Sequence, residues 1–145
     1  MEEILVRYLH FVGIIFFSGT LIFEHLTIKK RMTNENFKRL CQIDVFYGLS
    51  AIVVFTAGMF LWFTVGKDAS FYNANPLFHI KLTIFIVIGL LSIYPTIFFI
   101  KNRKTKEDFV DIPKRVIMYI NIELILFILL PLLASLIAQG YGLGD

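Results

Sequence analysis

The sequence predicts an all-α integral membrane protein, a four-helix up-down bundle with both termini outside the cytoplasm. Hydrophobic residues make up 57% of the 145 residues and the mean hydropathy is +0.75, well above the values of soluble domains. Four long apolar runs are separated by short polar connections, and basic residues gather in two of these connections. We therefore expect a single transmembrane domain that covers residues 1–145.

The four apolar runs are each long enough to cross a bilayer as a helix, because ~20 helical residues span a hydrocarbon core of ~30 Å. Their expected bounds are Ile4–Ile28, Ile43–Val65, Leu77–Ile100 and Val116–Ala138. The first run is not expected to be a cleavable signal, since Glu2 and Glu3 stand where such a signal has basic residues.

The basic residues predict the orientation of the bundle. Eleven of the 14 Lys and Arg residues lie in the first and third connections, at 29–39 and 101–115. A four-span protein has both connections on one side of the membrane, and the positive-inside rule places that side in the cytoplasm. The termini and the second connection then lie in the periplasm or outside the cell. We expect these basic residues to contact membrane lipid and not nucleic acid. The protein could also form a homo-oligomer.

Ionisable side chains inside the spans are candidate functional residues, because each costs ~2.5–3.5 kcal/mol at a helix centre. They fall into two levels along the bundle axis. The outer level, near the external ends of the first and third helices, holds Arg7, His10, His79 and Lys81. The inner level, nearer the cytoplasm, holds Glu24, Asp44 and Glu123.

The outer level suits an acceptor-bearing ligand, a carboxylated cofactor or a metal-bearing ring. His10 and Lys81 are expected ~9 Å and ~6 Å inside the same external boundary, so their side chains can line one pocket from facing helices. Haem b fits such a pocket, with His10 as the metal ligand and Lys81, His79 and Arg7 as further cofactor-binding residues. Each residue also has a simpler interpretation. His10 could be a hydrogen-bonded histidine of the bundle interior, and Lys81 could be a lysine that snorkels to the membrane interface.

The inner level places three carboxyl groups at similar depth without a basic partner. Glu24, Asp44 and Glu123 could share protons or hold a cation, and together with Lys81 they are the candidate catalytic residues. We expect Glu123 to face Glu24 or Asp44, because contact with lipid would be costly. Two simpler interpretations stay open, in which Asp44 caps the second helix and Glu24 pairs with lysines of the first connection.

Several motifs point to a known family. They are KDASFYNANPLFHIK at 67–81, SIYPT at 92–96, Asp44 with Tyr47-Gly48, and Pro131 with AQGYG at 138–142. With these motifs the chain resembles, over nearly its whole length, a family of small bacterial four-helix membrane proteins of unknown function. Within the first motif, Phe71 and Tyr72 are expected to close the outer pocket from above.

A more distant resemblance concerns function. Leu9-His10 opens the first helix and Phe78-His79-Ile80-Lys81 opens the third, and both are similar to membrane-embedded, haem-binding protoporphyrinogen oxidases and to copper-resistance membrane proteins. Those oxidases need a first-helix histidine and a lysine at the head of a later helix, which implies roles for His10 and Lys81. The resemblance implies a haem-binding redox protein of the inner membrane. The carboxylates leave an alternative, a non-enzymatic proton or ion conduit or a small transport accessory.

The topology predicts opposite accessibility for two engineered cysteines. Ser70→Cys lies in the second connection and Lys104→Cys in the third, so labelling should report them on opposite sides of the membrane. A membrane-impermeant maleimide applied to intact cells should label only the first. Labelling of both positions from the cytoplasmic side would contradict the four-span arrangement.

Overall fold

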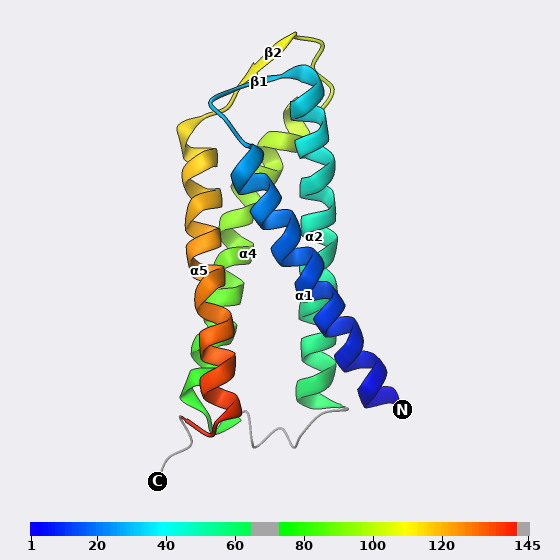
Figure 1. The fold of residues 1–145 in the computed structure, drawn as a ribbon, viewed down its shortest axis with the longest axis vertical. Coiled ribbons are helices and arrows are strands. Elements are labelled where there is room, and N and C mark those ends of the chain that lie inside the picture. The colour runs from blue at the N-terminus through cyan, green and yellow to red at the C-terminus, as the bar shows by residue number, and fades with distance from the viewer. Residues whose placement is uncertain (65–72, 142–145) are drawn as a thin grey trace.

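Four long helices dominate the computed structural model, which describes residues 1–64 and 73–141 (Figure 1). They are α1 (Glu2–Thr27), α2 (Asn34–Phe63), α4 (Pro76–Asn102) and α5 (Lys114–Ala138). Each is long and apolar enough to cross a membrane. Successive helices run in opposite directions, so α1 begins and α5 ends at the same end of the molecule. The predicted all-α, four-helix up-down bundle is confirmed.

The second helix begins earlier than its apolar run suggested. α2 starts at Asn34 and not at Ile43, because the Thr33 side chain caps it by accepting a hydrogen bond from the backbone amide of Asn36 at 3.3 Å. The added turns bury Phe37 and Leu40, which makes them part of the core. The other three helices lie within a few residues of the expected bounds.

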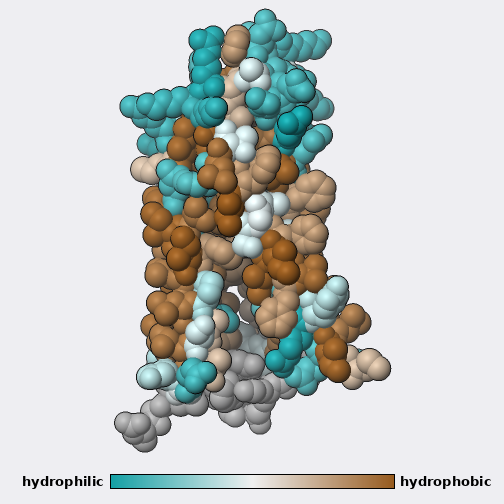
Figure 2. Space-filling view, in the orientation of Figure 1, coloured by the Kyte–Doolittle hydropathy of each residue, from teal (hydrophilic) through white to brown (hydrophobic). Residues whose placement is uncertain are grey.

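A short strand pair, which the sequence did not predict, joins the first and third connections. β1 (Arg31–Thr33) pairs antiparallel with β2 (Phe109–Asp111), and Met32 stands opposite Val110. Both of these central residues are buried, while their neighbours in the strands are exposed. The two basic connections therefore meet at one end of the bundle, where hydrophilic residues gather (Figure 2).

The helices pack as two hairpins, with α1 against α2 and α4 against α5. The first hairpin is tight where Gly13 crosses α2, since a Cβ at this position would lie 2.9 Å from Val54 Cγ2. Between the hairpins, the Phe17 ring packs against aromatic rings of the other three helices. Its centroid lies 4.8 Å from Tyr47, 5.8 Å from Phe85 and 5.4 Å from Phe127. Phe17 thus occupies the centre of the bundle.

The close approach at Gly13 predicts a stability difference between two glycines of α1. Gly13→Ala should lower the apparent melting temperature of the detergent-solubilised protein, because overpacking costs about 1–3 kcal/mol. A Cβ at Gly19 would instead point into open space, with no neighbouring helix within 4 Å. Gly19→Ala should therefore leave the melting temperature unchanged or raise it, since alanine favours helix. Equal melting temperatures for the two variants would contradict the tight crossing.

Candidate functional site

The structure contains two polar sites inside the apolar bundle, at the two levels that the sequence predicted. The first, which we call the carboxyl cluster, contains Glu24 of α1, Asp44 of α2 and Glu123 of α5. These residues are only 1%, 4% and 1% exposed. The expectation that Glu123 faces the bundle interior is confirmed, and it lies within electrostatic range of Asp44.

Polar side chains of different helices meet at the carboxyl cluster. The carboxyl groups of Glu24 and Asp44 lie close to each other, and Thr96 of α4 lies beside Asp44. The Tyr47 hydroxyl donates to Glu123 Oε1 over 3.5 Å, which is long for such a bond. Glu24 Oε1 is buried without a partner. Two carboxyl groups can form a hydrogen bond with each other only when one of them carries a proton.

Both simpler interpretations of the carboxylates are wrong. Asp44 does not cap α2, since Thr33 does so and Asp44 lies about three turns inside the helix. Glu24 does not pair with loop lysines, because it is buried and takes part in no ion pair among the described residues.

Within residues 1–64 and 73–141, no group of three His, Cys, Asp or Glu side chains is placed to hold a metal ion. Next to the cluster, His25 Nδ1 and Asn121 Oδ1 lie 2.7 Å apart and add a polar contact between α1 and α5.

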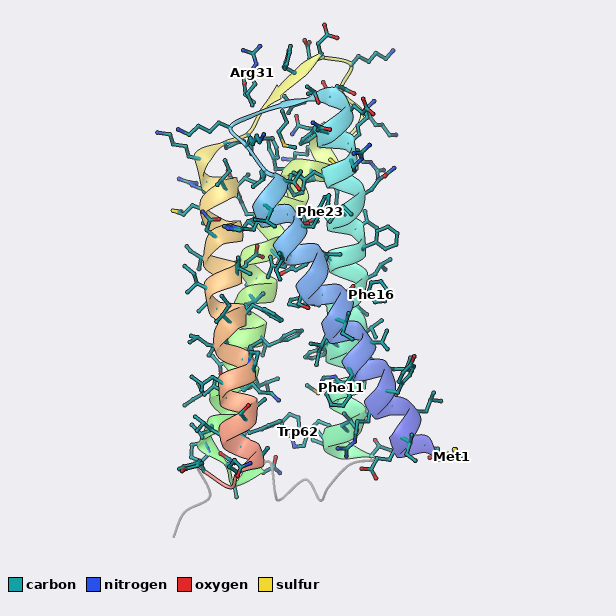
Figure 3. The ribbon with its side chains drawn as sticks, in the orientation of Figure 1. Met1, Phe11, Phe16, Phe23, Arg31 and Trp62 are labelled. Atoms are coloured by element: carbon teal, nitrogen blue, oxygen red, sulfur yellow. The ribbon has the colours of Figure 1, made fainter. Side chains whose placement is uncertain are left out.

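The second site is a cavity of about 480 Å³ between the hairpins, which we call the outer cavity. Both His10 and Lys81 line it, so the structure brings this predicted pair together. Its other walls are mainly aromatic and aliphatic. Phe11 and Trp62 belong to this lining and lie toward the end opposite the strands (Figure 3). The molecular surface is hollowed in the same region, between the α1 and α5 sides (Figure 2).

His10 is held in one orientation by the second helix. Its Nδ1 atom lies 3.1 Å from the carbonyl oxygen of Val54. A carbonyl only accepts, so this contact assigns the ring proton to Nδ1 and leaves the lone pair on Nε2. The ring packs beside Gly58, where a Cβ would be in ordinary van der Waals contact with His10 Cε1 at 3.4 Å. The imidazole therefore offers one nitrogen as a ligand.

Lys81 brings a positive charge into the same cavity. Its Nζ atom lies 5.9 Å from the centroid of the Phe78 ring, within the range of a cation–π contact. Among the described residues no carboxylate forms an ion pair with Lys81, although its charge acts on His10. The outer cavity is therefore electropositive and suited to an anionic group.

Two other predicted cofactor-binding residues are placed elsewhere. Arg7 pairs with Glu3 of its own helix at 2.6 Å on the exposed surface, and it does not line the outer cavity. His79 is exposed and its Nε2 atom lies 3.0 Å from the Asn73 carbonyl oxygen. The residues expected to close the pocket, Phe71 and Tyr72, lie outside the described part of the chain.

Aromatic residues that the sequence did not assign to the pocket line its outer end. Trp62 and Phe78 pack at a centroid distance of 4.9 Å, and Trp62 Nε1 donates to Asn73 Oδ1 at 3.1 Å. Tyr47 and Thr96 of the carboxyl cluster were also not foreseen as site residues. For Tyr47 a signal existed, because it follows Asp44 by three residues and so shares its helix face.

Two aromatic side chains connect the outer cavity with the carboxyl cluster. Phe17 lines the outer cavity and stacks on Tyr47, whose hydroxyl reaches Glu123.

Comparison with known proteins agrees with this membrane architecture. A family model described as "Predicted membrane protein (DUF2214)" matches residues 2–142. The chain belongs to this family. No curated protein and no solved structure matches it. The family supports the membrane-embedded fold, whereas the resemblance to haem-binding protoporphyrinogen oxidases and copper-resistance proteins is not shown by these comparisons.

Proposed function

We propose that this DUF2214 member is a haem-binding redox protein of the inner membrane, with haem b in the outer cavity. The observation that supports the proposal is the joint presence of His10 and Lys81 in one largely apolar cavity. His10 would hold the haem iron through Nε2. Lys81 would pair with a propionate or with an anionic substrate. A reaction like that of the protoporphyrinogen oxidases is the specific form of this proposal.

The residues of the outer cavity fit haem in size and chemistry. Its volume of about 480 Å³ lies within the range of ~300–1,000 Å³ that ligand pockets have. A histidine that ligates a metal usually donates a hydrogen bond from its other ring N–H, as His10 does from Nδ1 to the Val54 carbonyl. Met59 also lines the cavity and carries a thioether, which ligates haem iron in some cytochromes. Bound haem would supply one-electron chemistry, and the protein would supply orientation, charge and exclusion of water.

The orientation that we propose places the strand-pair end in the cytoplasm. Supporting it, the structure brings the two basic connections together at that end. The outer cavity and both termini would then lie toward the periplasm, and the basic end would contact anionic lipid headgroups.

The haem proposal predicts a difference between two partly buried histidines of α1. His10→Ala should abolish haem binding, because it removes the axial nitrogen, whereas His25→Ala should retain it because His25 contacts Asn121 instead. Lys81→Ala should lower haem occupancy with the fold intact. The measurement is the Soret absorbance of the purified protein, as isolated and after titration with haem. Equal binding by His10→Ala and the wild type would contradict the proposal.

The carboxyl cluster favours a second candidate function, a proton conduit or small transport accessory. Glu24, Asp44 and Glu123 come from three different helices and form a buried chain of proton acceptors with Tyr47. The unpartnered Glu24 Oε1 leaves a site where a further proton or water molecule can be accommodated.

Proton flux into liposomes tests this second function. Reconstituted wild-type protein should acidify or alkalinise the lumen along an imposed pH gradient, as followed by a trapped pH-sensitive dye. Glu123→Gln should slow this flux while inserting normally, because glutamine keeps the shape but cannot take up a proton. Glu107→Gln changes an exposed carboxylate and serves as the control. Wild-type flux equal to that of empty liposomes would rule out the conduit.

A further inference from the structure

A second cavity lies between α2 and α4, and neither function above uses it. It measures about 240 Å³ and we call it the α2–α4 crevice. Two polar side chains of the carboxyl cluster, Asp44 and Thr96, belong to its lining, together with Cys41. Arg103 lines it as well, just beyond the end of α4 at the basic end of the bundle.

The crevice opens along the apolar surface of α2 and α4. Its lining includes Val45, Leu49, Ile52 and Ile100, which are 52%, 54%, 64% and 56% exposed. On helices that span a bilayer, exposed aliphatic residues of this kind contact hydrocarbon. A ligand therefore reaches this cavity sideways from the lipid, which requires the ligand to be soluble in the membrane.

The polar residues restrict the chemistry of this ligand. Asp44 offers carboxyl oxygens, and the neighbouring Thr96 offers a hydroxyl group that can donate or accept a hydrogen bond. A buried carboxyl group gains most from a neutral hydroxyl donor, because no further charge has to be desolvated. The volume lies below the ~300–1,000 Å³ of pockets for drug-sized molecules, so a single ring fits and a long tail must remain outside.

We propose that the α2–α4 crevice binds the ring of a lipid-soluble quinol, with a ring hydroxyl donating to Asp44 and the tail leaving past Leu49 and Ile52 into the bilayer. The quinol combines a neutral hydroxyl donor, a single flat ring and solubility in hydrocarbon. A phospholipid fits less well: its phosphate would remain near Arg103, and its acyl chain would face Asp44 and Thr96 with methylene groups that cannot form hydrogen bonds.

This inference goes beyond the haem proposal and does not depend on it. The crevice and the outer cavity have no lining residue in common, so binding at the crevice needs no residue of the outer cavity. Haem-free protein can therefore be used in the test, so that the two proposals can fail separately.

Binding is measured by calorimetry on the detergent-solubilised full chain, with a fully substituted benzoquinol that carries a decyl tail. The wild type should bind it saturably. Thr96→Val should weaken binding about five-fold, as expected for one hydrogen bond. Leu49→Trp should abolish binding by filling the crevice from its lipid side. Thr83→Val and Leu90→Trp, which change exposed residues of α4 outside the crevice, should bind as the wild type does.

A second readout uses the only cysteine of the chain. Cys41 lines the crevice, so the bound quinol should slow its alkylation by a membrane-soluble maleimide, and phosphatidylglycerol at equal concentration should not. This readout needs no mutation and therefore does not depend on how well the variants fold. No saturable binding, unchanged binding in both crevice variants, or equal protection by the phospholipid would each overturn the proposal.

Discussion

The arrangement of the bundle depends on how a bilayer treats buried carboxyl groups. Hydrocarbon offers no hydrogen bonds, so the carboxyl groups of Glu24, Asp44 and Glu123 have to find partners inside the protein. The polar side chains around them come from all four helices, because Thr96 of α4 lies beside Asp44. This single requirement fixes which face of each helix turns inward. The hydrophobic contacts around Phe17 could tolerate other rotations, whereas an acid turned toward lipid could not be tolerated.

The sequence predicted the four spans well because the membrane imposes both their length and their composition. It failed at the start of α2 and at the strand pair for a common reason. The early turns of α2 and the three-residue strands lie outside the apolar runs, where hydropathy no longer marks the elements. The pairing of Met32 with Val110 also joins segments that are far apart in the chain, and the residues of one strand do not predict which segment pairs with it.

The sequence predicted those site residues that are ionisable, because such side chains are costly inside a membrane. It missed the site residues whose types are common in membrane helices. His10, Lys81 and the three acids stand out because ionisable groups are rare inside spans, and counting rise per residue was enough to group them by depth. Threonine, tyrosine and glycine occur throughout such helices, so Thr96 and Gly58 carried no comparable signal, and Tyr47 was marked only by its position three residues after Asp44. Arg7 shows the opposite error, since its charge is balanced by Glu3 one turn away on its own helix.

The strand pair ties the two hairpins together at one end of the molecule. β1 and β2 lie at the same end as the carboxyl cluster, while the outer cavity lies toward the far ends of helices that are ~39 Å long, as for the 26 residues of α1. The hairpins are joined at the cavity end as well, because Trp62 of α2 packs on Phe78 of α4 and donates to Asn73. Any change in the spacing of the hairpins would therefore have to alter one of these two junctions.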